Sequence, residues 1–315
     1  INQQLVSELP LNGRNFVQLA ILSPGVNGTG YSTAGTIQSG ARPDDRRPGT
    51  EIFSNGNREG SNNFLYDGVD NNERLIQLIV YRPAVEAIRE FKVQTNLYSA
   101  DVGRNSGAVV DVISKSGTSR LQGIVFEFHR NSAMDAKDFF TRPGASIPPF
   151  RYNQFGFSLG GPWYIPKVYD GRNKTFWFVD YEGFRRSFLR TLNTTIPTLA
   201  MRTGDFSGQP NTIFDSTRPQ GAGFVREQFP GNRIPALRFD PVTAKLINAY
   251  PTPQTTGLAN NYVAQLQQTQ DWNQGDVRVD HQFTPNDNFF ARCSLQHTTT
   301  FAPNTFPDAQ IAAVT

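Results

Sequence analysis

The sequence has one cysteine, two methionines and no long apolar run. Because Cys293 stands alone, an intrachain disulfide is impossible, and a disulfide-stapled secreted fold is excluded. The longest apolar stretches, around Leu75–Val80 and Ile21–Leu22, fall far short of the roughly 18 residues that a membrane-spanning helix requires. If this chain crosses a membrane, it must do so as a β-barrel, the other structure that satisfies every backbone polar group in lipid.

The chain also lacks a concentrated charge. Its formal net charge is +3, and the arginines are scattered among acids and glycines, so no basic face for nucleic acid is indicated. Ile1 opens without a basic n-region, an apolar h-region or a cleavage site, and we expect the N-terminus to be cut or processed. A length of 315 residues allows about two domains.

Residues 1–118 are predicted to form a small α+β domain. The segment after Phe16 has helical spacing and stops at Ser23-Pro24-Gly25, and Phe64–Asp70 predicts a strand that enters an Asp67-Gly68 turn. A short helix over Pro83–Ile88 leads into a strand over residues 88–94, and β-branched residues predict a further strand over residues 108–114.

After Thr118 the pattern changes to strict alternation of apolar and polar residues, which is typical of half-buried strands. Five segments show it or continue it: Ile124–His129, Gln154–Leu159, Thr175–Phe184, Asp276–Phe283 and Phe289–Gln296.

The connections between these segments alternate in length. The first and third are long, over residues 131–150 and 187–274, whereas the second (162–173) and the fourth (284–288) are shorter. Outer-membrane barrels have short periplasmic turns and long extracellular loops, so residues 119–315 are predicted to be the first strands of an antiparallel transmembrane β-barrel.

Several motifs resemble the plug of TonB-dependent receptors, and of the Oar-like group of acidobacteria in particular. They are Leu9–Phe16, Tyr66–Val69, and residues 88–115 from Ile88-Arg89-Glu90-Phe91 to Ile113-Ser114-Lys115. Phe155–Pro162 and Phe176–Gly183 resemble the early barrel strands of the same group. The similarity covers the whole chain.

The resemblance implies a plugged barrel of about 22 strands in the outer membrane of a Gram-negative bacterium, of which this chain would be a fragment. It further implies energy-coupled uptake or binding of a large or scarce extracellular solute, with the inner-membrane TonB protein as a partner that captures an N-terminal segment by strand addition. We expect that segment to lie outside the given sequence, together with any carboxypeptidase-regulatory-like domain of the kind that usually precedes the plug in this group. Outer-membrane lipid is the other implied partner.

No catalytic, cofactor or metal residue follows from the resemblance, and the ligand-binding residues stay unknown. The positions carried over are structural plug positions, with glycines that permit tight turns and close approach of backbones: Asn12, Gly13, Arg14, Asp67, Gly68, Gly103 and Gly107.

Competing motifs are weaker. Gly156-Phe157-Ser158-Leu159-Gly160 fits a hydrolase nucleophile elbow, but Gly160-Gly161-Pro162 follows and does not favour the required helix. The three histidines have no ligand spacing and are predicted to face the lumen or lie in loops, and the acids near Asp67 depart from a calcium-loop pattern. A set of strand aromatics is expected to face lipid or the membrane interface rather than bind sugar: Phe126, Phe128, Phe155, Phe157, Trp177 and Tyr181.

Two alternatives to transport stay open. A surface adhesion or assembly protein would keep the architecture without import, and an extracellular β-rich hydrolase would need a catalytic group that the sequence does not offer beyond Ser158.

Overall fold

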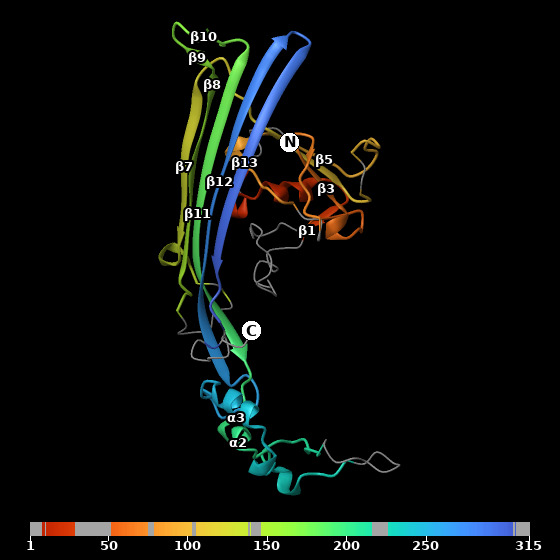
Figure 1. Ribbon diagram of the computed structural model, residues 1–315, viewed down its shortest axis with the longest axis vertical. Helices are drawn as coiled ribbons and strands as arrows, with labels where there is room; N and C mark the ends of the chain where they lie inside the picture. The colour runs from red at the N-terminus through yellow and green to blue at the C-terminus, as the bar shows by residue number, and fades with distance from the viewer. Residues whose placement is uncertain are drawn as a thin grey trace. The chain divides into compact units, whose positions relative to one another are not determined.

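A computed structural model describes residues 8–9, 11–28, 52–74, 79–102, 105–137, 139, 146–215, 226–304 and 306. The chain forms two compact units, one of Ile1–Ser187 with Thr269–Thr300 and one of Phe188–Gln268 with Phe301–Thr315. The first unit contains an N-terminal lobe, defined here as the described residues up to Thr118, and most of a five-stranded sheet (Figure 1).

The N-terminal lobe is built on a four-stranded sheet in the order β4-β3-β6-β5, in which β3 and β6 are parallel and the other pairs antiparallel. A separate two-stranded sheet pairs β1 with β2. The elements are η1 (Asn12–Arg14), η2 (Phe16–Leu22), β1 (Val26–Gly28), β2 (Ile52–Ser54), η4 (Glu59–Ser61), β3 (Asn63–Tyr66), β4 (Val69–Asp70), η5 (Val85–Ala87), β5 (Ile88–Gln94) and β6 (Val109–Ser114).

Local sequence explains these elements. Asp67 and Gly68 have φ angles of 52° and 76°, the left-handed pair that a tight hairpin between β3 and β4 requires. The two predicted helices form as 3₁₀ segments of seven and three residues, and each ends in extended backbone. The lobe has its own apolar core, in which Phe16 packs edge-on against Phe91 with ring centroids 5.6 Å apart.

The larger sheet has the strand order β7-β8-β11-β12-β13, and each predicted alternating segment lies in one of its strands. Their bounds are β7 (Gln122–Asn131), β8 (Phe150–Pro162), β11 (Thr175–Thr194), β12 (Tyr262–Thr284) and β13 (Asp287–Phe301), with η6 (Ser132–Met134) after β7. The expected loop over residues 187–274 was too long: β11 continues to Thr194 and β12 begins at Tyr262, since their polar residues still alternate between faces.

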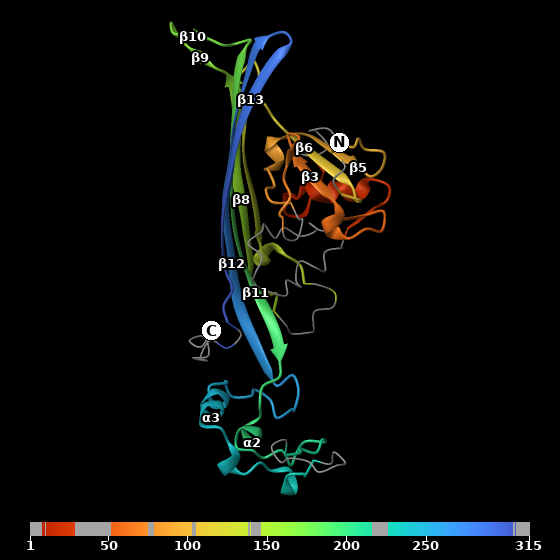
Figure 2. The same cartoon turned by 45° about the vertical axis from the view of Figure 1, so that its right-hand side comes forward.

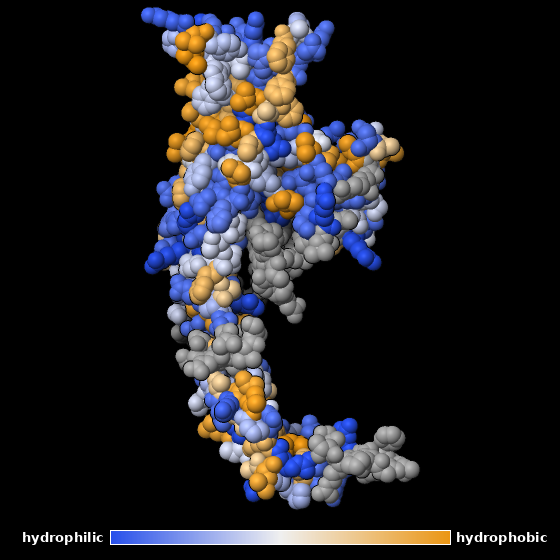
Figure 3. All heavy atoms as spheres, viewed as in Figure 1, coloured by the Kyte–Doolittle hydropathy of each residue, from blue (hydrophilic) through white to orange (hydrophobic). Residues whose placement is uncertain are grey.

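The two faces of this sheet differ. The inward face, defined as the one that contacts the N-terminal lobe, carries Gln154, Glu182 and Asp276, all buried. The outward face carries an apolar band near the short connections, where Figure 3 shows apolar residues gathered. By strand alternation the band includes Val125, Phe155, Phe157, Leu159, Trp177, Val179, Tyr181, Val277, Val279 and Leu295.

The short connections are a hairpin and a turn. The hairpin consists of β9 (Tyr164–Ile165) and β10 (Tyr169–Asp170) and joins β8 to β11, and residues 285–286 join β12 to β13. Both lie at the same end of the sheet (Figures 1 and 2). Short connections at one end are how outer-membrane barrels are connected on their periplasmic side.

The second unit contains α2 (Leu199–Arg202), η7 (Pro230–Asn232), η8 (Ala236–Arg238) and α3 (Pro241–Asn248). Asp240 caps α3 by accepting from the amides of Val242 and Thr243. Over the described residues, no helix has the length and apolar character needed to span a membrane.

Candidate functional site

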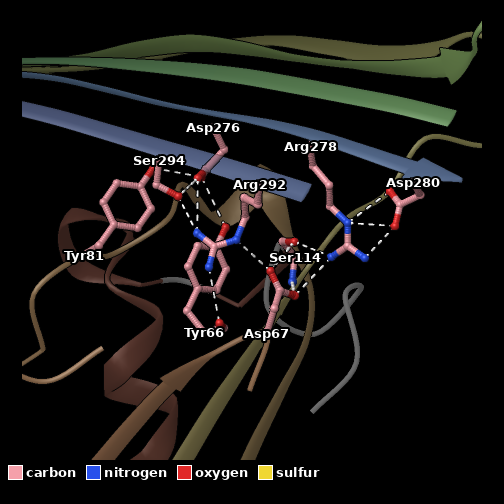
Figure 4. Close-up of polar contacts among 9 residues, drawn as sticks. All are labelled: Tyr66, Asp67, Tyr81, Ser114, Asp276, Arg278, Asp280, Arg292 and Ser294. Atoms are coloured by element: carbon pink, nitrogen blue, oxygen red, sulfur yellow. Dashed lines mark hydrogen bonds and ion pairs between the residues drawn. The ribbon is translucent and has the colours of Figure 1, made fainter. Parts of the chain in front are cut away.

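The contact between the N-terminal lobe and the inward face of the sheet is mainly polar. Figure 4 shows side chains from the two parts interdigitated in one network. The lobe contributes Tyr66, Asp67, Tyr81 and Ser114, while β12 and β13 contribute Asp276, Arg278, Asp280, Arg292 and Ser294.

Asp67 is the centre of one half of this network. Its carboxylate accepts hydrogen bonds from the backbone amide of Ser114 at 2.9 Å and from the Ser114 hydroxyl at 2.8 Å. It also pairs with Arg278 at 3.1 Å and with Arg292 at 2.9 Å. Its side chain is 4% exposed, so one buried carboxylate of the lobe faces two guanidinium groups of the strands.

Asp276 is the centre of the other half. Its carboxylate accepts hydrogen bonds from the hydroxyls of Tyr81 at 2.8 Å and Tyr66 at 3.2 Å. Ser294 and Arg292 lie beside it on the strands. The Arg292 guanidinium also lies over the Tyr66 ring, 3.6 Å from its centroid, and thereby joins the two halves.

The two phenols act as neutral donors. Burial, and then the negative charge of Asp276, raise the pKa of Tyr66 and the pKa of Tyr81 well above their ordinary value. Each hydroxyl therefore keeps its proton and can donate it to the carboxylate over the whole physiological pH range.

A second contact joins Arg14 of η1 to β7, the first strand of the larger sheet. The Arg14 guanidinium forms an ion pair with Glu86 and lies 4.1 Å from the centre of the Phe128 ring and 5.4 Å from that of Phe126. Phe126 and Phe128 pair with Gly156 and Gln154 of β8, so they face inward. The expectation that these two aromatics face lipid was wrong, because β7 carries apolar residues on both faces and its alternation alone does not assign them.

The described apolar core clusters include one that joins the lobe to the sheet, where Phe178 of β11 packs on Ala84 and Ala87. In the larger core of the lobe, the described residues all belong to the lobe itself. The interface therefore depends on hydrogen bonds and ion pairs more than on apolar packing.

The predicted plug positions have separate roles. Arg14 and Asp67 are the ones that reach the strands, and Gly13 (φ 63°) and Gly68 provide the left-handed backbone beside them. Gly107 allows a close approach inside the lobe, since a Cβ there would lie 2.5 Å from the Ser61 carbonyl oxygen. Gly103 lies outside the described residues, as does the side chain of Asn12.

The serine and the histidines of the competing motifs lie within strands of the larger sheet. Ser158 lies on the inward face within β8, which continues to Pro162 without a turn into a helix. His129, His281 and His297 lie on the outward faces of their strands, so the expected lumen or loop placement was wrong. Across the described chain no three His, Cys, Asp or Glu side chains are grouped to hold a metal ion.

The second unit has a cavity of its own, of about 570 Å³. Its lining mixes apolar side chains with amides, hydroxyls and the Asp205 carboxylate, and includes Leu199, Met201, Phe206, Gln209, Gln254 and Leu258. A mainly apolar lining with a few polar groups is typical of sites that bind small solutes.

Sequence reasoning missed Tyr81, Asp276, Arg278 and Arg292. A signal was present, because the alternate positions of β12 and β13 carry charged and polar residues where a lipid-facing series would be apolar. The partner of each charge lies far away in the sequence and could not be named from it.

Comparison with known proteins settles the family. Residues 113–314 match the family model described as an outer membrane beta barrel domain. The chain belongs to the outer membrane β-barrel domain family. It is accordingly an outer-membrane protein of a Gram-negative bacterium, and the curated relative found is a transporter rather than an enzyme.

The chain is similar to three individual proteins that can be named. The chain is 24% identical over 209 residues to the "TonB-dependent transporter Oar" of Myxococcus xanthus, covering 65% of this chain and 17% of that protein. In fold it resembles the outer membrane transporter YddB of Escherichia coli, with a TM-score of 0.51 at 12% identity, over 96% of this chain and 33% of that one. The siderophore receptor PirA of Acinetobacter baumannii aligns over 97% of this chain and 32% of its own, with a TM-score of 0.46 and 15% identity. The chain thus spans a third or less of the length of these proteins.

Proposed function

We propose that residues 1–118 are the plug and residues 119–315 the first barrel strands of a TonB-dependent transporter, which imports a large or scarce solute with energy supplied through TonB. The observation that carries the proposal is the polar interface between lobe and strands. A plug that must be displaced repeatedly is better held by groups that water can solvate than by a large apolar contact, whose separation would cost about 25 cal/mol for each Å² exposed.

The similarity to the TonB-dependent transporter Oar supports the same proposal. In this proposal, the insertion between β11 and β12 and the connection between β7 and β8 lie outside the cell and take part in solute capture. The cavity lined by Phe206 and Leu258 is a described part of the insertion that can receive a solute group.

The test compares solutes left in the growth medium by three strains of the source bacterium: wild type, a strain without this gene, and a strain without TonB. Transport predicts that the gene-deletion strain and the TonB-deletion strain leave at least one solute in common that the wild type depletes. A strain without the gene that depletes every solute normally, but no longer attaches to surfaces, would contradict transport and favour an adhesion protein.

A further inference from the structure

The β9–β10 hairpin presents an exposed apolar surface at the end of the sheet where the short connections lie. Trp163, Tyr164, Ile165 and Tyr169 are each between 39% and 47% exposed, and Val168 at the tip is 78% exposed. Large contiguous apolar patches are rarely exposed on soluble proteins, and such a patch indicates a surface that binds a protein or a membrane.

The shape of the hairpin is fixed. The Ile165 carbonyl accepts a hydrogen bond from the Val168 amide at 3.1 Å, with Pro166 and Lys167 at the corner. Lys167 has a φ of 64°. A type II turn requires such a positive φ at its third residue and favours proline at its second, which is Pro166 here. The turn therefore holds Val168 outward at its tip.

The hairpin is tied to the outward face of the sheet. The Tyr169 hydroxyl contacts the Thr175 hydroxyl at 2.6 Å, and Thr175 contacts His281 Nδ1 at 2.7 Å. Thr175 and His281 alternate in phase with Trp177 and Val279 of the apolar band. The exposed surface of the hairpin thus continues the surface that a barrel turns toward lipid. Figures 1 and 2 both show the hairpin leaning away from β8 and β11 at that end.

The charge of the hairpin indicates which part of the lipid it meets. It has three basic residues, Lys167, Arg172 and Lys174, but one acidic residue, Asp170, which pairs with Arg172 at 2.7 Å. The Arg172 guanidinium also lies 4.6 Å from the centre of the Tyr164 ring. Aromatic side chains beside basic ones are typical of the boundary between acyl chains and headgroups, where rings enter the lipid and cations meet phosphate.

We propose that the β9–β10 hairpin inserts into the periplasmic leaflet of the outer membrane and binds the headgroups of anionic phospholipids through Lys167 and Lys174. Val168 and Ile165 enter the acyl boundary, and the two lysines stay at the level of the phosphates. The hairpin anchors the barrel laterally at its periplasmic rim. This role depends on membership of the barrel family and is independent of whether the protein transports a solute.

The test places a spin label on the full-length protein in lipid nanodiscs. Val168→Cys is labelled in a background in which Cys293 and any other cysteine are replaced by serine, and Asn286→Cys in the β12–β13 turn is the matched control at the same end. We expect the label at 168 to be several-fold less accessible to a water-soluble nickel chelate than the label at 286, and more accessible to oxygen. Equal, high nickel accessibility at both positions would overturn the proposal, and so would protection at 168 that appears only when a periplasmic protein is added. Only variants that keep heat-modifiable migration on gels, the sign of a folded barrel, are used. Tyr164→Cys is the second labelling site if Val168→Cys does not fold.

A second measurement tests the headgroup. Native mass spectrometry compares retention of phosphatidylglycerol with that of phosphatidylcholine for the wild type and for the Lys167→Gln, Lys174→Gln double variant. Each lysine near an anionic surface is expected to contribute about a fivefold preference for phosphatidylglycerol, which the double variant should lose. Lys92→Gln, on an exposed position of β5, should keep it. An unchanged preference in the double variant would overturn the assignment to anionic headgroups.

Discussion

Arg292 of β13 pairs with Asp67 of the β3–β4 turn, with its Nε atom 2.9 Å from the carboxylate and its guanidinium over the Tyr66 ring. The pair joins the N-terminal lobe to the last strand of the described sheet. The lobe can therefore reach its full set of contacts only after β12 and β13 have formed, and each contact can be tested separately.

Replacing Asp67 by asparagine should weaken the attachment of the lobe to the strands. The substitution keeps the shape but removes the charge that faces Arg278 and Arg292, and breaking a buried ion pair costs about 3–5 kcal/mol. Hydrogen exchange of the β3 and β6 amides in the full-length protein should become faster. Asp170→Asn is the control, since the exposed Asp170–Arg172 pair is worth little. Equal acceleration in both variants would argue against a special role for Asp67.

High pH should weaken the attachment of the lobe to the strands, because Tyr66 and Tyr81 then ionise. The pKa values of Tyr66 and Tyr81 are raised in the folded protein, so their contribution to stability is full below the unfolded value of about 10 and is lost as the pH rises above it. Phenolate absorbance should show a late, cooperative step in the wild type that is missing from the Tyr66→Phe, Tyr81→Phe double variant. If these two residues ionised at the same pH as the exposed tyrosines, that result would contradict their burial against Asp276.

Arg14→Lys should weaken the attachment of the lobe to β7, although the substitution keeps the positive charge. Lysine can still pair with Glu86, but it lacks the flat guanidinium that lies over Phe128, and the expected loss is about 1–2 kcal/mol. A double-mutant cycle with Phe128→Leu isolates that contact, and Arg89→Lys on exposed β5 is the control. Additive effects of Arg14→Lys and Phe128→Leu would mean that the two side chains do not interact.

Val277→Arg should destabilise the barrel in lipid. Val277 is 52% exposed on the outward face, within the apolar band, and arginine near the middle of a bilayer costs about 2–4 kcal/mol on such a face. Urea unfolding of the full-length protein in phospholipid vesicles measures the loss. Asn288→Arg, on the inward face of β13 beside the β12–β13 turn, should cost far less because it does not face lipid, and a similar loss at both positions would mean that the loss does not come from lipid.

The sequence was most informative where local chemistry decides structure. Alternation located the strands, and the Asp67-Gly68 pair located a hairpin, because both depend on residues close together in the chain. Strand ends were less predictable: β11 and β12 extend far into the expected loop, since polar strands beyond the apolar band have no hydrophobic signal to mark them.

Side-chain partners were predicted least. Phe126 was assigned to the lipid face, although it lies under Arg14, and that contact joins segments that are distant in sequence. Similarly, Arg14 and Asp67 were singled out as plug positions with no partner named, because Phe128 and Arg292 become neighbours only when the lobe meets the sheet.

The most direct test of the transporter account is thiol labelling of Ser114→Cys in living cells, in a background in which the exposed Cys293 is replaced by serine. Ser114 is 1% exposed and lies between Asp67 and Arg278, so a cysteine there is protected while the lobe stays against the strands. With a maleimide small enough to enter the periplasm, we predict labelling several-fold faster in cells that contain TonB than in cells without it. Equal labelling rates in the two strains, during growth on medium from which the wild type is actively depleting solute, would contradict a plug that TonB displaces.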